Sequence, residues 1–155
     1  MTLDQAPESR QPTAIDQIAE DWVTTLADLD PTVATWIGLP GRLGEYGDQS
    51  PAGQARYIDE AKRVITRLAA AEPIDAVDRV TRTDLLADLR LSIEGDAAGL
   101  HLRDLNVIAS PAQNLRDVFD LMPTATEAEW GDISSRLRNL PAAIDGYIET
   151  LRLGI

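Results

Sequence analysis

The fold class is decided by the stretch AVDRVTRTDLLADLRLSI, residues 76–93. Its apolar side chains recur mostly at three- and four-residue steps with charged residues between them, which is the pattern of one buried face on an α-helix. The apolar positions are Val77, Val80, Leu85, Leu86, Leu89 and Ile93. We therefore predict a helix over residues 75–98, with this stripe facing a protein core.

The same period occurs on both sides of this stretch. Asp30-Pro31, Ser50-Pro51 and Ser110-Pro111 each place a capping side chain before a proline, and a helix start has no use for the N–H that proline lacks. We expect further helices over residues 13–29, 31–37, 51–71, 111–122, 124–139 and 141–153. Their predicted inward residues are Ile15, Ile18, Trp22, Leu26, Leu29, Val33, Trp36, Ile37, Tyr57, Ile58, Ala61, Ile65, Leu68, Leu115, Val118, Phe119, Met122, Trp130, Ile133, Leu137, Ile144, Tyr147, Ile148 and Leu151.

The starts of the last two helices are set by threonine and proline. Thr124 followed by Glu127 resembles a capping box, and Thr126 is a rival cap for the same helix. Pro141 is expected to open a separate last helix, because proline suits a first helical position. Gly154 is a possible stop for that helix.

Two segments break the helical period. Residues 38–49 hold glycines 38, 41, 44 and 47, a density that predicts an irregular loop. Residues 100–109, LHLRDLNVIA, alternate like a short strand, but no partner strand is visible, so we predict an ordered, partly buried connector. The predicted fold is an all-α, compact array of about six helices. We expect a flexible tail over residues 1–12 and a single helical domain over residues 13–155 that is part of a larger fold.

Composition restricts the classes of function. The 155 residues include no cysteine, which excludes disulfides, thiol catalysis and cysteine-based zinc sites. The formal net charge of −12 repels nucleic acid and anionic lipid, so neither is an expected partner. Apolar runs are too short to span a bilayer, and residues 1–12 do not resemble a signal peptide. A cytoplasmic location is therefore expected.

Chemistry-bearing residues form no complete set, so we predict no catalytic, cofactor-binding or metal-binding residues in this chain. His101 is the only histidine, and one histidine cannot supply a two-histidine zinc helix or a paired Glu-x-x-His site. No serine lies in a nucleophile motif with it. The glycine-rich segment 38–47 lacks the Gly-Lys-Ser/Thr ending of a phosphate loop.

Acidic pairs and tryptophans leave weaker alternatives open. Three carboxylate pairs have helical spacing, and we interpret them as solvated faces near Arg82, Arg90 and Arg116. The pairs are Asp16 with Glu20, Asp84 with Asp88, and Asp117 with Asp120. The second and third pairs remain a possible cation or small-molecule site. Of the three tryptophans, at residues 22, 36 and 130, most are expected in the core and one is a candidate interface marker.

Four stretches resemble a known family. They are LDPTVATWIGLPG (residues 29–41), DQSPAGQAR (48–56), AVDRVTRTDLLADLRL (76–91) and RDLNVIASPAQNLRDVFDLMPT (103–124). Together they resemble the N-terminal part of the bacterial DUF885 family, over roughly residues 15–151. The segments RDLNVIASP and VFDLMPT are fairly specific to this family, whereas the apolar stripes of the helices between them are not.

The resemblance implies an architecture without a site. Family members are much longer and resemble helical zinc metallopeptidases, with a His-Glu-x-x-x-Gly-His helix downstream of the matched region. This chain contains no such motif, so no zinc ligand or general base is carried onto its residues. What the resemblance implies is an N-terminal helical segment that packs on a catalytic half.

Two hypotheses about function follow. In the first, the chain is the non-catalytic N-terminal helical portion of a DUF885 metallopeptidase-like protein, and its partner is the remainder of a longer chain. In the second, it is an autonomous module for protein–protein interaction or self-association as a homo-oligomer. Both need an exposed apolar patch, for which the last helix offers Ile144, Ile148, Leu151 and Leu153.

Overall fold

The computed structural model describes residues 10–155, and within that range it contains six α-helices, two 3-10 helices and no strand. They are α1 (Ala14–Leu29), α2 (Pro31–Ile37), α3 (Pro51–Ala70), α4 (Ala76–Ala97), η1 (Leu100–Arg103), α5 (Pro111–Asp117), η2 (Val118–Leu121) and α6 (Glu127–Arg152). The predicted all-α class is confirmed. No helix of the described range is both long and apolar enough to cross a bilayer. The expected flexible tail lies outside the described residues except for its last three positions.

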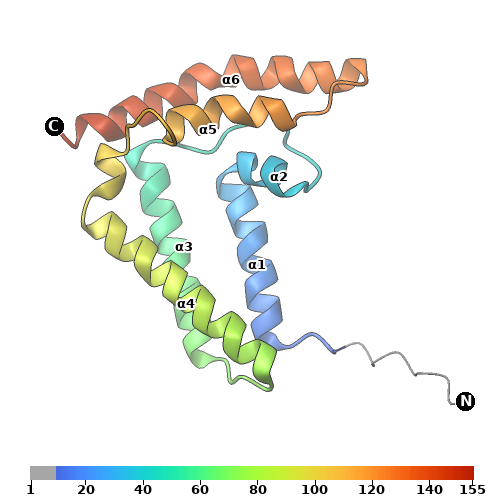
Figure 1. The fold of residues 1–155 in the computed structure, drawn as a ribbon, viewed down its shortest axis with the longest axis vertical. Coiled ribbons are helices and arrows are strands. Elements are labelled where there is room, and N and C mark those ends of the chain that lie inside the picture. The colour runs from blue at the N-terminus through green and yellow to red at the C-terminus, as the bar shows by residue number, and fades with distance from the viewer. Residues whose placement is uncertain (1–9) are drawn as a thin grey trace, which may run out of the picture.

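The helices form two layers, one of which lies across one end of the other (Figure 1). The first, which we call the hairpin layer, consists of the antiparallel pair α3 and α4 with α1 packed against both. The second, the crossbar layer, consists of α5 and α6 side by side, with α2 and η2 in contact beneath them. The main apolar core lies inside the hairpin layer. Its fully buried members are Ile15, Ile18, Trp22, Ala61, Val64, Leu68 and Leu89.

Side-chain caps explain where the helices begin. Asp30 accepts a hydrogen bond from the backbone N–H of Thr32 at 2.9 Å and so starts α2, as predicted. At α6 the rival cap is the correct one. Thr126 caps the helix, and the Glu129 carboxylate accepts from the Thr126 N–H at 2.8 Å. The predicted box of Thr124 with Glu127 is wrong, because the glutamate that completes a box lies three residues after Thr126.

Pro141 does not begin a separate helix. α6 runs unbroken from Glu127 to Arg152 with Pro141 inside it, so the predicted division at this residue is wrong. An interior proline removes a hydrogen bond and costs about 3 kcal/mol. Tertiary contacts on both sides of it hold the helix. Asn139 donates to the carbonyl of Gly44 at 2.8 Å, and the Tyr147 hydroxyl donates to the carbonyl of Asp104.

The inward faces of α4 and α6 differ from the predicted stripes, because a charged residue lies inward on each helix. Asp78 is 0% exposed in the first turn of α4, so the neighbouring Val77 and Val80 face solvent. On α6 Arg136 is 0% exposed, so the adjacent Leu137 faces outward. Pattern analysis assigns charged residues to the outer face of a helix, and at these two positions buried polar partners override that rule.

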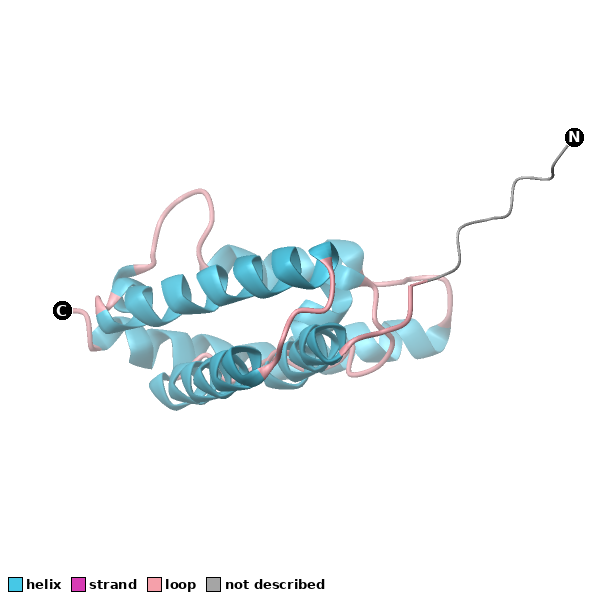
Figure 2. Cartoon of the chain, turned by 90° about the horizontal axis from the view of Figure 1, so that it is seen from below, coloured by secondary structure: helices cyan, strands magenta, loops and turns pink. Residues whose placement is uncertain are grey.

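The connector after η1 is ordered but not buried. Val107 is 94% exposed and Ile108 is 85% exposed, so the prediction of a partly buried segment is wrong for this part. Asn106 holds the backbone instead: its side-chain oxygen accepts from the N–H groups of Ile108 and Ala109 at 2.9 and 2.8 Å. The loop between η1 and α5 arches away from the helices (Figure 2).

Candidate functional site

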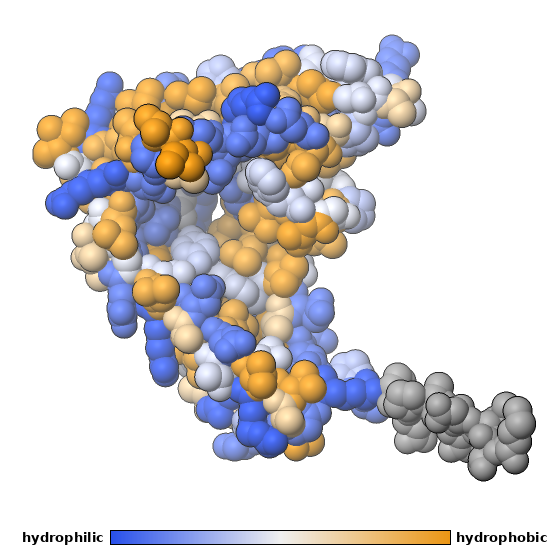
Figure 3. All heavy atoms as spheres, in the orientation of Figure 1, coloured by the Kyte–Doolittle hydropathy of each residue, from blue (hydrophilic) through white to orange (hydrophobic). Residues whose placement is uncertain are grey.

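A central cavity of about 270 Å³ lies between the two layers. Space-filling atoms show the surface hollowed between the crossbar and the hairpin (Figure 3). The wall comes from five separate stretches of the chain. Its residues are Leu26, Leu29, Asp30, Val33, Asp48, Gln49, Ser50, Gly53, Gln54, Tyr57, His101, Asp104, Pro111, Tyr147 and Thr150. This cavity is where side chains that are distant in sequence converge.

Local structure explains how the cavity wall is built. Asp30 ends α1 and caps α2, so the chain turns there and brings Val33 beside Leu29. At the start of α3, Gly53 lies so close to the carbonyl of Asp48 that a Cβ atom would clash with it. Glycine therefore lets the loop approach α3. Tyr57 packs its ring against Trp22, with centroids 5.7 Å apart, which joins the cavity to the main core.

Three side chains of the wall donate hydrogen bonds within the protein. The Thr150 hydroxyl donates to the carbonyl of Gln49 at 2.8 Å, and Tyr147 donates to the carbonyl of Asp104. The Gln54 amide donates to Asp96 at 3.0 Å. These bonds attach α6 to the loop before α3 and to the connector, so the cavity wall is a fixed feature of the fold.

His101 lies in this wall, in η1, and is partly exposed. Its Nδ1 is 3.4 Å from the Asp96 carboxylate, but this buried nitrogen has no aligned hydrogen-bond partner. A zinc site of the type that the resemblance implies does not fit these residues. Within residues 10–155, no three His, Cys, Asp or Glu side chains are grouped as metal ligands, and the chain holds only one histidine.

The predicted carboxylate pairs do not converge on one site. Asp84 and Asp88 are exposed on α4 and form no ion pair with other described residues. Asp117 and Asp120 both pair with Arg116, at 3.0 and 2.5 Å, as expected for a solvated face. The predicted partners of the α4 pair, the arginines at 82 and 90, make no such contact.

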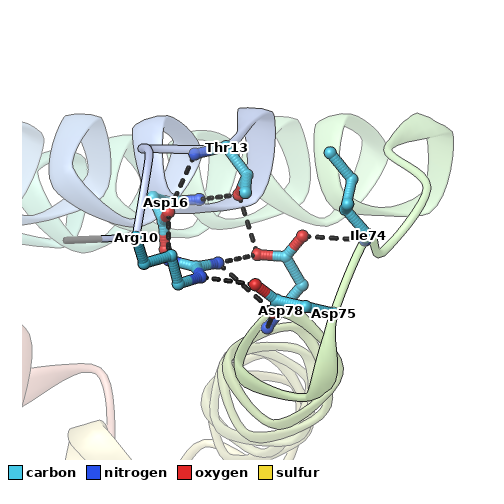
Figure 4. A network of polar contacts seen from close by, with 6 residues as sticks. All are labelled: Arg10, Thr13, Asp16, Ile74, Asp75 and Asp78. Carbon is cyan, nitrogen blue, oxygen red and sulfur yellow. Dashed lines mark hydrogen bonds and ion pairs between the residues drawn. The ribbon is translucent and has the colours of Figure 1, made fainter. Parts of the chain in front are cut away.

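Asp16 belongs instead to a polar network at the far end of the hairpin layer (Figure 4). Arg10 contacts the carboxylates of Asp16, Asp75 and Asp78, and so ties the start of α1 to the start of α4. A backbone hydrogen bond from Thr13 and the contact with Arg10 lower the pKa of Asp16, and Arg10 lowers the pKa of Asp75. This network gives the buried carboxylate of Asp78 an ion pair with Arg10 and hydrogen bonds from Thr13 and from the backbone of Ile74.

Arg136 is, with Asp78, one of two buried charged residues that sequence reasoning missed. Both of its terminal nitrogens donate to the hydroxyl of Thr35 at 3.1 Å, and its guanidinium carbon lies 5.5 Å from the centre of the Tyr46 ring. Burial lowers the pKa of Arg136 and raises that of Tyr46 to about 12. The Tyr46 hydroxyl donates to the carbonyl of Leu115 at 2.6 Å. The group joins α6 to α2, and no sequence pattern marks it.

A second hollow, the α5/α6 groove, has a different character. Its volume is about 360 Å³ and its lining is almost wholly apolar. The lining residues are Leu105, Ala112, Leu115, Arg116, Leu140, Ile144, Tyr147, Ile148 and Leu151. Apolar side chains are visible along this layer in Figure 3. Ile144 and Ile148 of the predicted patch lie here, and the exposed Val107 and Ile108 follow Leu105 in the connector.

Of the tryptophans, only Trp22 is buried. Trp36 is 49% exposed on α2 and Trp130 is 57% exposed on α6, so the expectation that most tryptophans lie in the core is wrong. Both exposed rings lie in the crossbar layer. The hairpin layer also exposes large apolar side chains, among them Val77, Val80 and Leu91.

A family model described as a bacterial protein of unknown function, DUF885, matches residues 31–155. The chain belongs to the DUF885 family. The matched region begins at Pro31, the first residue of α2, so α1 precedes it although α1 supplies three residues to the main core. No curated protein matches the chain. In this DUF885 chain the described elements α2 to α6 are thus the family region, and the cavity and the groove both involve it.

Proposed function

We propose that this chain is the non-catalytic helical portion of a DUF885 protein, whose α5/α6 groove is covered by another part of the same protein. The observation that carries the proposal is the combination of the groove with Val107 and Ile108, which are almost fully exposed in an ordered connector. Contiguous apolar surface of this kind marks docking sites in soluble proteins. The metallopeptidase-like family members that this chain resembles are longer. We therefore propose that the segment covering the groove is another part of the same protein.

The contacts of the groove support a rigid docking surface. Asn106 fixes the connector by hydrogen bonds, including one from its side-chain amide to the carbonyl of Ala109 at 2.6 Å. Gln113 of α5 donates to the backbone of Asn106 at 2.9 Å, so the connector and α5 hold one geometry. A preformed apolar surface loses little conformational entropy on binding.

Zinc content tests the non-catalytic role. The purified chain is expected to bind no stoichiometric zinc and to cleave no peptide, whereas a longer DUF885 protein with the His-Glu-x-x-x-Gly-His helix is expected to bind zinc. The measurements are metal analysis after dialysis and a peptide-hydrolysis assay. Tight zinc binding by this chain would contradict the proposal.

A second candidate function is self-association through the same groove. The exposed Ile144 and Ile148 suit a symmetric apolar contact between two copies as well as a contact within one protein. Light scattering over a dilution series distinguishes the two. A dimer that withstands dilution and is lost on Ile148→Asp favours self-association, and a monomer favours the first proposal.

The location of the protein is part of the same proposal. We propose a cytoplasmic protein, which the absence of cysteine from all 155 residues supports. Fractionation of cells that express the native gene is the test, and recovery in a membrane or extracellular fraction would contradict it.

A further inference from the structure

Two hydroxyl groups in the wall of the central cavity already donate their protons within the protein. The hydroxyl protons of Tyr147 and Thr150 are used in bonds to backbone carbonyls, so their oxygens are left with lone pairs only. A molecule that enters this space therefore meets two hydroxyl oxygens that can only accept a hydrogen bond.

The wall also carries negative charge. Asp30, Asp48 and Asp104 line the cavity, and no lysine or arginine does. The guanidinium of Arg56 forms an ion pair with the carboxylate of Asp48 at 2.7 Å. Asp30 accepts three hydrogen bonds, all on one carboxylate oxygen, and Asp104 makes only a long contact with Asn106 at 3.4 Å. Asp30 and Asp104 thus keep acceptor capacity and form no ion pair with a described residue, although the charge of Asp30 interacts with that of buried Arg136.

Apolar and aromatic groups form the rest of the wall. Leu26, Leu29 and Val33 contribute one side, and the rings of Tyr57 and Tyr147 contribute another. A cavity of about 150 Å³ is large enough for benzene, and the central cavity measures about 270 Å³. It therefore has room for one ring with a short substituent.

We propose that the central cavity is a binding site for a small organic cation, an ammonium group on an apolar or aromatic body. Asp30 and Asp104 accept the charge, and the faces of Tyr57 and Tyr147 attract it through their π electrons. Leu29 and Val33 contact the apolar body. The site shares only Tyr147 with the groove, and it does not depend on the role proposed above.

Three ligands of one shape test the charge preference on the native chain. Benzylammonium, neutral benzyl alcohol and anionic benzoate are titrated at pH 7 by calorimetry. Benzylammonium is expected to bind saturably and about tenfold or more tighter than benzyl alcohol, while benzoate does not bind. Amide NMR shifts are expected to cluster at cavity residues such as Gln54 and Thr150. Equal binding of alcohol and ammonium, shifts elsewhere, or no saturable binding of benzylammonium overturns the proposal.

Matched variants test whether Asp30 and Asp104 bind the ammonium group of the ligand. Asp30→Asn keeps a capping side chain, because asparagine caps helices as well as aspartate, and Asp104→Asn lies in the connector. The double variant is expected to weaken benzylammonium binding about tenfold and to leave benzyl alcohol unchanged. Asp84→Asn, on the exposed face of α4, is the control and should change neither affinity. An unchanged benzylammonium affinity in a folded double variant overturns the assignment. If that variant does not fold, the ligand comparison on the native chain decides.

Discussion

The hairpin layer and the crossbar layer bury their surfaces in different ways. In the hairpin layer, seven fully buried apolar residues form one cluster between α1, α3 and α4. In the crossbar layer, the buried set includes Arg136, Thr32, Ser110 and Thr150, while Trp36 and Trp130 are exposed. The first layer is stabilised mainly by apolar burial. The second also buries apolar residues, such as Leu115 and Val118, but it adds directional polar contacts among buried groups.

The largest effect on the free energy of unfolding is expected in the apolar core of the hairpin layer, and it tests this comparison. Leu89→Ala removes a side chain that is 0% exposed, and it should lower the free energy of unfolding by about 2–5 kcal/mol. Leu91→Ala, on the same helix but 68% exposed, should change it by less than about 0.5 kcal/mol. Urea unfolding followed by circular dichroism measures both. Equal effects would show that the core has been misplaced.

The stability of the crossbar layer should fall when a single hydroxyl group is removed. Thr35→Val removes the acceptor for both terminal nitrogens of Arg136 and leaves a buried guanidinium unsatisfied. We expect a loss of about 1–3 kcal/mol in the free energy of unfolding. Thr24→Val, an exposed position on α1, is the matched control. A Thr35→Val protein as stable as the control would mean that polar contacts do not hold this layer.

Acid should weaken the Arg10 network. The folded pKa values of Asp16 and Asp75 are lowered, so their stabilising contribution is present above the ordinary value of 3.8 and is lost as the pH falls through the lower folded values. Arg10→Gln is expected to make the acid loss of stability less steep, and Arg79→Gln, which removes an exposed arginine, should not. Thermal melting between pH 2 and about 7 measures the slopes. A slope that Arg10→Gln leaves unchanged contradicts this account.

The smallest effect on stability is expected in the connector. Ile108→Asp replaces a side chain that contacts solvent, so the free energy of unfolding should change by less than about 0.5 kcal/mol. Binding of a hydrophobic dye to the native protein should fall, because the apolar surface beside the groove is reduced. A loss of stability as large as that of Leu89→Ala would show that Ile108 is part of the core.

The positions of most helices could be predicted from the sequence, whereas the buried faces of α4 and α6 could not. Caps and prolines at Asp30-Pro31 and Ser50-Pro51 determine helix starts through local chemistry, which any sequence shows directly. Asp78 and Arg136 lie inward because partners 68 and 101 residues away reach them, and local patterns contain no such information. Pro141 stays helical for a similar reason.

The candidate sites were harder to predict than the fold. The central cavity draws its wall from α1, α2, α3, η1, α5 and α6, so its residues have no common spacing in the sequence. His101 was identified as the only histidine, but its place in the wall depends on how η1 meets α6. The groove was foreseen in part, since Ile144, Ile148 and Leu151 recur on one face of α6.

Side-chain footprinting with hydroxyl radicals tests the central claim, that the crossbar layer is a docking surface, most directly. The purified chain and a longer DUF885 protein that contains it are labelled in parallel at a concentration where both are monomeric. Labelling of Val107, Ile108 and Ile148 is expected to fall several-fold in the longer protein, while Val80 and Leu91 of the hairpin layer stay equally reactive. Equal labelling of Val107, Ile108 and Ile148 in both proteins would contradict the account.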